Sequence, residues 1–274
     1  MCGIFGVVGS LTQVRADVAV LAKHSERRGK DASGLYLNVH DEYHLYRSNF
    51  TITKLVDKIQ FDHSNFIMGH SRLVTNGDDD NQPVYRDSIC VIHNGIVVND
   101  SELWKTSKKT RVQVIDTEII AALASEMLAG SDDINSMAEE IISRCRGVVS
   151  CAVALPKCGK LVLISNNGSL YFGNKNQCIY FASERNTLSS VKCEKITQIK
   201  NRFLVINIPK SLTEPLVNNK TSDDNRLLVP SLGFLKAEER LLKFDRFSGK
   251  RCTKCILPET MPFIRFDSDG ICFC

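Results

Sequence analysis

The order of apolar segments along the chain constrains its fold more than any other feature of the sequence. Segments typical of strands dominate both halves of the chain, and a block of two helical segments separates them. The strand segments are 1–9, 35–40, 43–48, 66–73, 88–98, 148–155, 160–166, 169–173, 178–182 and 202–208. Because helices do not alternate regularly with strands, we expect an α+β protein with two antiparallel sheets and helices packed outside, and no doubly wound sheet.

Three segments show the period of helices, namely 13–27, 116–129 and 134–145. In the first, the apolar face is expected to consist of Val14, Val18, Leu21 and Ala22. The predicted N-caps of the other two are Asp116 and either Ser131 or Asp132, and the predicted stop signals are Gly130 and Gly147.

The composition is typical of a globular protein that can form a sizeable core without disulfides or a metal, since 43% of the 274 residues are hydrophobic. A net charge of +4 gives no support to nucleic acid binding, which usually needs a basic face. The sequence shows neither a long apolar run nor a signal peptide pattern, so we expect no membrane contact and a cytoplasmic location. The 11 cysteines are therefore expected to be reduced, and clustered cysteines indicate a metal site or catalysis.

Cys2 is followed by a glycine and begins an apolar segment. Aminopeptidases remove an initiator methionine when the next residue is small, which would give Cys2 a free α-amine beside its thiol. The reference pKa of such an amine is about 7.7–8.0 and that of a thiol about 8.5, so the amine can act as general base for the thiol at neutral pH. Cys2 is then a candidate nucleophile that attacks a carboxamide and releases ammonia. A small apolar side chain in a buried strand is the alternative.

Three further motifs place polar residues at the ends of predicted strands or at a helix start. The motif GHSRLVTNG offers Arg72 as a bidentate partner for a carboxylate. In IHNGIVVND, the Asn94 amide and the Gly95 backbone offer two donors for one oxyanion. DTEIIAALASEM begins with Asp116, whose carboxylate suits an ammonium group. The respective alternatives are a structural ion pair, an Asn-Gly hairpin turn and a helix N-cap.

Five motifs occur in the order and approximate spacing of the class II glutamine amidotransferases, which are N-terminal nucleophile hydrolases, and the sequence resembles that family over residues 2–208. They are CGIFG (2–6), RGKDASG (28–34), GHSRLVTNG (69–77), HNG (93–95) and DTE (116–118), and FASERNTL (181–188) resembles a further family segment. The resemblance implies a four-layer α/β/β/α sandwich of two antiparallel sheets. It also implies glutaminase chemistry that needs no cofactor.

The resemblance implies a role for each matching residue. Cys2 is the nucleophile with its own α-amine as base, and Asn94 with Gly95 forms the oxyanion hole. Arg72 binds the α-carboxylate of L-glutamine, while Asp116 binds its α-ammonium group, assisted by the Gly95 carbonyl. Two further residues expected to line this pocket are Val74 and Thr75.

The sequence departs from the usual family pattern at a few positions. Lys30 occupies a proline position in the 28–34 loop, and Leu73 and Asn76 stand where many members carry Trp and His, which leaves the subfamily open. No catalytic atom is lost by these changes. The residues that we expect to be structural are Arg28, Asp31, His70 and His93.

A second cysteine motif occupies residues 251–274. Its members are Cys252, Cys255, Cys272 and Cys274, a Cys-x-x-Cys pair followed by a Cys-x-Cys pair, and this spacing is close to that of a zinc ribbon. A structural zinc is therefore predicted, with unliganded cysteines in a tail as the alternative. The segment also resembles the start of N-acetyl sugar amidotransferases, where it precedes an ATP-pyrophosphatase domain.

We therefore expect an amidotransferase domain at 2–208, a linker and helix at 209–250, and the start of a synthetase domain at 251–274. The predicted function is release of ammonia from L-glutamine for a synthetase or ATP-pyrophosphatase partner that amidates an activated acceptor. By resemblance of the C-terminal segment, the acceptor is a sugar in surface-polysaccharide synthesis. The alternatives are an asparagine-synthetase-like amidotransferase domain, a catalytically silent regulatory or scaffold domain, and a zinc-ribbon binding module.

Overall fold

The computed structural model describes residues 2–10, 14–39, 42–61, 64–74, 80–131, 133–209, 249–255, 257–261 and 263–273. The predictions for Thr75, Cys274 and most of the 209–250 linker and helix concern residues outside these ranges. Among the described helices, none has the length and apolar character needed to cross a membrane. The cysteines in the described ranges are free thiols.

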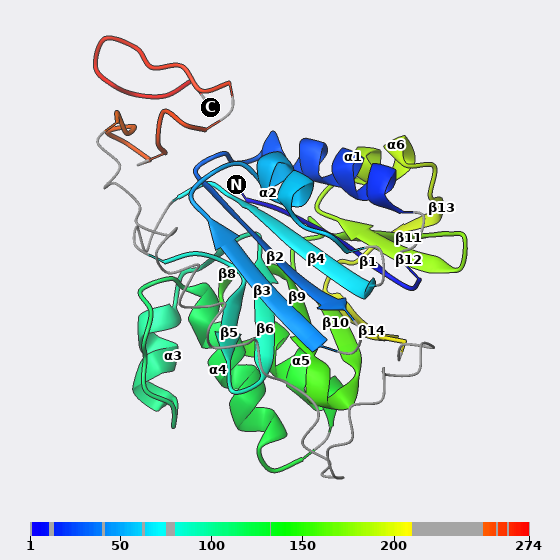
Figure 1. The fold of residues 1–274 in the computed structure, drawn as a ribbon. Coiled ribbons are helices and arrows are strands. Elements are labelled where there is room, and N and C mark those ends of the chain that lie inside the picture. Colours follow the sequence, from blue (N-terminus) through cyan, green and yellow to red (C-terminus); the bar gives the residue numbers. More distant parts are fainter. Residues whose placement is uncertain are drawn as a thin grey trace.

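The first sheet has seven antiparallel strands in the order β13-β11-β12-β1-β4-β2-β3 (Figure 1). Their bounds are β1 (Gly3–Val8), β2 (Ala32–Val39), β3 (Glu42–Ser48), β4 (Ser64–Arg72), β11 (Tyr171–Lys175), β12 (Cys178–Ala182) and β13 (Glu194–Gln198). One face of this sheet is covered by α1 (Arg15–Glu26), α2 (Ile52–Lys58) and α6 (Arg185–Ser190). The predicted apolar face of the first helix is confirmed, because Val14, Val18, Leu21 and Ala22 are all buried.

The second sheet has five antiparallel strands in the order β14-β10-β9-β6-β5. Their bounds are β5 (Val84–Arg86), β6 (Ile89–His93), β9 (Ser150–Leu155), β10 (Lys160–Ser165) and β14 (Arg202–Asn207). The outer face is covered by α4 (Thr117–Leu128) and α5 (Ile134–Arg144), and α3 (Asp100–Thr106) packs beside α4. A separate two-stranded ribbon is formed by β7 (Ile96–Val97) and β8 (Gly147–Val148), and a short 3-10 helix, η1 (Pro156–Cys158), joins β9 to β10.

Both sheets are buried on both faces, because side chains of successive strand residues point to opposite sides. In β1, Phe5 and Val7 pack against the helices, whereas Ile4 and Val8 face the other sheet. The inter-sheet core continues through Ile92 of β6 and its neighbours. The structure thus has four layers, in the order helices, sheet, sheet and helices, with an apolar cluster between each neighbouring pair. This order confirms the predicted α/β/β/α sandwich. Burial on both faces also explains why strands such as β1 read as continuous apolar runs.

Some local predictions were wrong. The N-cap of α5 is Asp133, whose carboxylate accepts the amides of Asn135 and Ser136 at 3.0 and 3.1 Å, and not Ser131 or Asp132. The residue directly before the first helical turn is the one whose side chain can reach those amides, which favours Asp133. Gly147 does not end α5, because the helix stops at Arg144 and Gly147 begins β8 with a φ of +109°.

Candidate active site

Cys2 lies beside the end of β4, because β1 and β4 are antiparallel neighbours. Gly3 pairs with Ser71 in the register of these strands, which places Cys2 next to Arg72. The Cys2 Sγ atom donates to the carbonyl oxygen of Leu73 at 3.6 Å. Burial raises the pKa of the Cys2 thiol, and the Arg72 guanidinium acts in the opposite direction. A thiol with a raised pKa is protonated at neutral pH and needs a base before it can attack.

Arg28 holds the backbone of Cys2. Its Nε atom donates to the Cys2 carbonyl oxygen at 2.8 Å, and its Nη1 atom forms a 2.5 Å ion pair with Glu184. Since Glu184 lies just after β12, the arginine ties the start of β1 to the end of β12. The position of Cys2 is thus fixed by a side chain as well as by strand pairing.

The rest of the 28–31 loop clamps the end of β4. The Asp31 carboxylate accepts the Val74 amide at 2.8 Å, and the Asp31 amide donates to the Arg72 carbonyl oxygen at 3.0 Å. Gly29 packs so closely that a Cβ atom there would lie 2.4 Å from the carbonyl carbon of Arg72. These contacts confirm that Arg28 and Asp31 anchor the loop. They also place Val74, which is buried, directly after the anchored strand end.

Arg72 is the largest fully buried side chain of the described residues, with 2% of its surface exposed. Burial lowers its pKa, and Cys2, Asp80, Asp31 and Asp116 raise it in that order. A guanidinium stays charged after such a shift because its reference pKa lies above 12. A buried cation therefore lies close to the thiol and to Asp116, which makes this arginine unlike a surface ion-pair residue.

Asn94 and Gly95 do not form a hairpin turn. β6 ends at His93 and pairs with β5 and β9, whereas β7 begins at Ile96 and pairs with β8. The backbone N–H of Asn94 donates to the Ser150 carbonyl oxygen at 2.8 Å. The two residues carry the chain from the second sheet to the separate ribbon, so the hairpin alternative is wrong.

Close packing requires glycine at position 95. A Cβ atom there would lie 1.8 Å from the Val148 carbonyl oxygen and 2.7 Å from Nε2 of His93. Beside it, the Asn94 Nδ2 atom donates to Ser183 Oγ at 3.4 Å, and its Oδ1 atom is buried without a hydrogen-bond partner among the described residues. Because the two ends of an amide have nearly the same shape, a half-turn of this side chain lets Ser183 donate to oxygen and leaves the NH₂ group as a free donor.

Asp116 stands directly before the first residue of α4, yet its side chain makes no capping bond. Its Oδ2 atom instead accepts the Val97 amide at 2.8 Å, and the residue is buried with 4% of its surface exposed. The prediction of a helix start at Asp116 is confirmed, whereas the side-chain N-cap is wrong because the carboxylate turns toward β7. A buried carboxylate with one occupied oxygen suits binding of a cation.

The two histidines near the site are buried and neutral. Burial lowers the pKa of His93, and Asp116 opposes this effect. Its Nε2 atom lies 3.1 Å from the Val148 carbonyl oxygen and its Nδ1 atom 3.5 Å from Thr117 Oγ1, so the ring connects β8 to the start of α4. Burial holds the pKa of His70 well below its usual value. His93 thus has the contacts of a structural residue, as predicted.

Sequence reasoning missed the residues that join these parts. Ser183 Oγ accepts the Ile4 backbone amide at 3.0 Å and contacts Asn94, and it links β1 to the Asn94–Gly95 segment. Gln82 Oε1 accepts the His93 amide at 2.6 Å. Ser183 lies in the FASERNTL segment that resembles the family, which was the one signal for it, whereas nothing in the sequence singled out Gln82.

Residues 249–273 contain a separate cluster of three thiols. The sulfur atoms of Cys252, Cys255 and Cys272 all lie within 4.8 Å of one another. Cys252 Sγ accepts backbone amides from Lys254, Cys255 and Cys272 at 3.3 to 3.4 Å. A set of convergent sulfurs whose backbone donors favour the thiolate is able to hold a metal ion.

The chain is similar to known proteins over part of its length. Residues 70–190 match the model of a glutamine amidotransferase domain. The glutamine–fructose-6-phosphate aminotransferase of Thermococcus kodakarensis is 30% identical over 195 residues, which are 67% of this chain and 32% of that protein. The Pyrococcus horikoshii enzyme of the same name is 32% identical over 165 residues, 56% of this chain and 27% of its own. This chain thus spans about a third of the length of the curated relatives that it matches.

The solved structure of glutamine phosphoribosylpyrophosphate amidotransferase from B. subtilis shares the fold. Its TM-score is 0.62 at 19% identity, over 75% of this chain and 47% of that chain.

Residues 70–190 therefore match a glutamine amidotransferase domain, and the chain shares the fold of the solved amidotransferase. The aminotransferases and the amidotransferase named above are among the proteins that are similar to this chain.

Proposed function

We propose that residues 2–208 form a domain that hydrolyses L-glutamine to glutamate and ammonia, with Cys2 as the nucleophile. The observation that supports this most is the convergence of the thiol, the buried Arg72, the buried Asp116 and the Asn94–Gly95 segment from four different elements. A buried positive and a buried negative side chain near one nucleophile match the two charged ends of a free amino acid.

The reaction begins after removal of Met1, which gives Cys2 a free α-amine. This amine takes the thiol proton, directly or through one water, because the raised pKa of the thiol prevents spontaneous ionisation. Sulfur attacks the side-chain carbonyl carbon of glutamine, and the resulting oxyanion is bound by Asn94 and Gly95. The protonated amine then gives its proton to the departing nitrogen, so ammonia leaves and a thioester remains. Water, deprotonated by the same amine, hydrolyses the thioester to glutamate and restores the thiol.

The other site residues select the substrate. Arg72 binds the α-carboxylate of glutamine, and Asp116 binds its α-ammonium group together with the Gly95 carbonyl. Val74 and Thr75 line the pocket. Because both charged ends are held at fixed positions, only a side chain of glutamine length brings its amide to the thiol.

Glutamate release by the purified protein tests this proposal, with Cys2→Ala as the control and intact mass to establish that Met1 is absent. We expect release by the parent protein and none by Cys2→Ala. Cys158→Ala is the matched control, because this exposed cysteine lies in η1, far along the chain from the site, and should leave the rate unchanged. Full activity of Cys2→Ala refutes the proposal.

We further propose that the ammonia serves a synthetase that amidates an activated sugar. Support comes from relatives whose name includes fructose 6-phosphate as an acceptor, and from the resemblance of residues 251–274 to the start of N-acetyl sugar amidotransferases. In this proposal residues 209–250 link the two domains, and the synthetase or ATP-pyrophosphatase is the partner. Glutaminase rates measured with and without such a synthetase and its sugar test it, since a coupled partner should stimulate glutamate release and produce an aminated sugar.

We also propose that the cysteine cluster binds zinc, with Cys274 as the fourth ligand. Two thiolates on one tetrahedral zinc lie about 3.8 Å apart, given Zn–S bonds of about 2.3 Å, and the three sulfurs already lie within 4.8 Å. Metal analysis of the purified protein should give one zinc per chain. Cys252→Ser should remove it and Cys158→Ser should not. Equal zinc contents in both variants contradict the proposal.

A further inference from the structure

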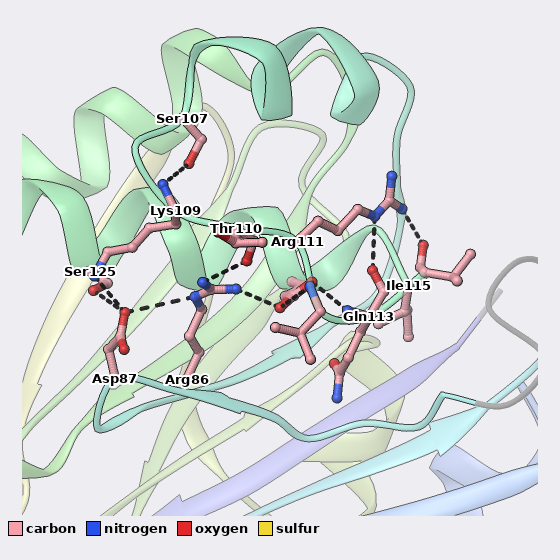
Figure 2. Close-up of polar contacts among 12 residues, drawn as sticks. Arg86, Asp87, Ser107, Lys109, Thr110, Arg111, Gln113, Ile115 and Ser125 are labelled. Carbon is pink, nitrogen blue, oxygen red and sulfur yellow. Dashed lines mark hydrogen bonds and ion pairs between the residues drawn. The ribbon is translucent and has the colours of Figure 1, made fainter.

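The segment that leads into Asp116 is held largely by polar contacts, because Ile115 is the one of its three apolar side chains that is buried in the core. Residues 107–115 connect α3 to α4 (Figure 2). Val112 and Val114 point their side chains outward, with 80% and 64% of their surfaces exposed. A loop that exposes most of its apolar side chains needs other contacts to fix its path. Here they are hydrogen bonds between the backbone groups of the loop and charged side chains outside it.

The first anchor is a buried ion pair between Arg86 of β5 and Glu118 in the first turn of α4. The Arg86 Nη1 and Glu118 Oε1 atoms are 2.6 Å apart, with side-chain exposures of 14% and 3%. The same carboxylate accepts the amides of Val112 at 3.0 Å and Gln113 at 2.8 Å, and Arg86 Nη2 donates to the Thr110 carbonyl oxygen at 2.8 Å. One ion pair thus binds three backbone groups of the loop (Figure 2).

The second anchor is Asp80. Its Oδ2 atom accepts the amides of Val114 at 2.6 Å and Ile115 at 2.9 Å. The two carboxylates of Asp80 and Glu118 therefore bind four successive backbone amides, from residue 112 to residue 115. The next residue is Asp116, whose carboxylate accepts the Val97 amide at 2.8 Å.

We propose that Arg86, Glu118 and Asp80 are positioning residues for Asp116, which set the place of the ammonium-binding carboxylate and hence the affinity for glutamine. This role rests on the proposed function of Asp116. Removing the Glu118 carboxylate leaves Arg86 with only the more distant carboxylate of Asp87, at 3.7 Å, and the loop amides lose a charged acceptor. The loop then shifts, and a carboxylate displaced by even about 1 Å loses most of a charge-assisted contact.

Glu118→Gln is the main variant, because it keeps the size of the side chain and removes its charge. We expect a KM for glutamine about tenfold higher and a kcat within about twofold, since Cys2 and the oxyanion donors are untouched. Arg86→Lys keeps the charge but loses the fork that reaches both Glu118 and Thr110, and it should raise KM by a smaller factor. Lys108→Gln is the control. Lys108 lies exposed in the same loop and takes no part in the contacts of Arg86, Glu118 and Asp80 described above, so KM should not change.

Amide hydrogen exchange at Val97 tests the same inference without turnover. In Glu118→Gln, a displaced Asp116 should release the Val97 amide and speed its exchange along with that of residues 112–113. Faster exchange at 112–113 alone, with the exchange of Val97 and KM unchanged, overturns the inference. If the parent protein releases no glutamate, the proposed function fails, but the exchange of Val97 still decides whether Glu118 positions Asp116.

Discussion

Gly95→Ala tests the oxyanion position most directly, because the structure gives the size of the disturbance. The new Cβ atom would lie 1.8 Å from the Val148 carbonyl oxygen, and side-chain carbons essentially never approach within 3.0 Å of such an atom. The segment has to move by at least about 1.2 Å to relieve this contact. Movement away from Val148 carries the backbone amide of residue 95 with it.

This displacement is large compared with the tolerance of an oxyanion hole. Donors act at about 2.7–3.1 Å from the oxyanion, and loss of one donor lowers kcat by roughly 10²- to 10³-fold, or about 2.7–4 kcal/mol. We expect a loss of this size in kcat for glutamate release. KM should rise by a smaller factor than kcat falls, because the Gly95 carbonyl is only one of the groups proposed to bind the charged ends of glutamine, beside Arg72 and Asp116.

The assay measures kcat and KM for glutamate release together with thermal unfolding. Gly130→Ala is the matched control, since a Cβ at that glycine meets no atom within 4 Å and its activity should equal that of the parent. A folded Gly95→Ala variant with the kcat of the parent would refute the assignment of Gly95 to the oxyanion hole. Equal losses in both glycine variants would refute it as well.

Three further predictions follow from the same contacts. Asp116→Asn should raise KM for glutamine by roughly ten- to a hundredfold, because a hydrogen bond to a charged group contributes about 1.5–3 kcal/mol. The Asn oxygen can still accept the Val97 amide, so the local backbone contact is kept. An unchanged KM in steady-state kinetics contradicts the ammonium role. Arg28→Met should lower kcat by about tenfold, because the Cys2 carbonyl loses its donor, and an unaltered kcat shows that strand pairing alone holds the nucleophile. Stability in urea should fall as pH drops below about 6.5, by up to about 1.4 kcal/mol per pH unit for each buried histidine. The folded pKa values of His70 and His93 are lowered, so the unfolded chain binds protons first; a urea midpoint that stays constant between pH 7.5 and 5.5 would exclude this.

The sequence was sufficient to predict the long helices and strands and the order of the layers. Strands buried on both faces and helices of eleven or twelve residues, such as α4 and α5, leave strong apolar patterns. Short elements were missed: α2 and α3 have seven residues each, too few for two clear helical repeats. The edge strand β13 reads EKITQ and is mostly exposed or half-buried, so it has no apolar run to detect.

The candidate site likewise has residues that the sequence could predict and residues that it could not. Cys2, Arg72, Asn94 and Asp116 lie in local motifs that the sequence displays, and the structure places them near one another. Residues that join them, such as Ser183, act through partners far away in the chain: Ser183 and Ile4 are separated by 179 positions. The Ser183–Ile4 contact arises from the pairing of β12 with β1, and the Ser183–Asn94 contact from the packing of the two sheets; no periodicity or local spacing encodes either contact.

The parts of the candidate site belong to different sheets. Cys2 and Arg72 extend from β1 and β4 of the seven-stranded sheet, whereas Asn94 follows β6 of the five-stranded sheet. The distance between the proposed nucleophile and the proposed oxyanion donors is therefore a distance between two layers, set by the apolar side chains that separate them. Loss of a methyl group from that interior, for example in Ile92→Val, should alter this distance and thereby the reaction rate, even though no reacting atom touches the methyl group. The apolar layer between the two sheets thus sets the spacing of the groups that are proposed to react at its edge.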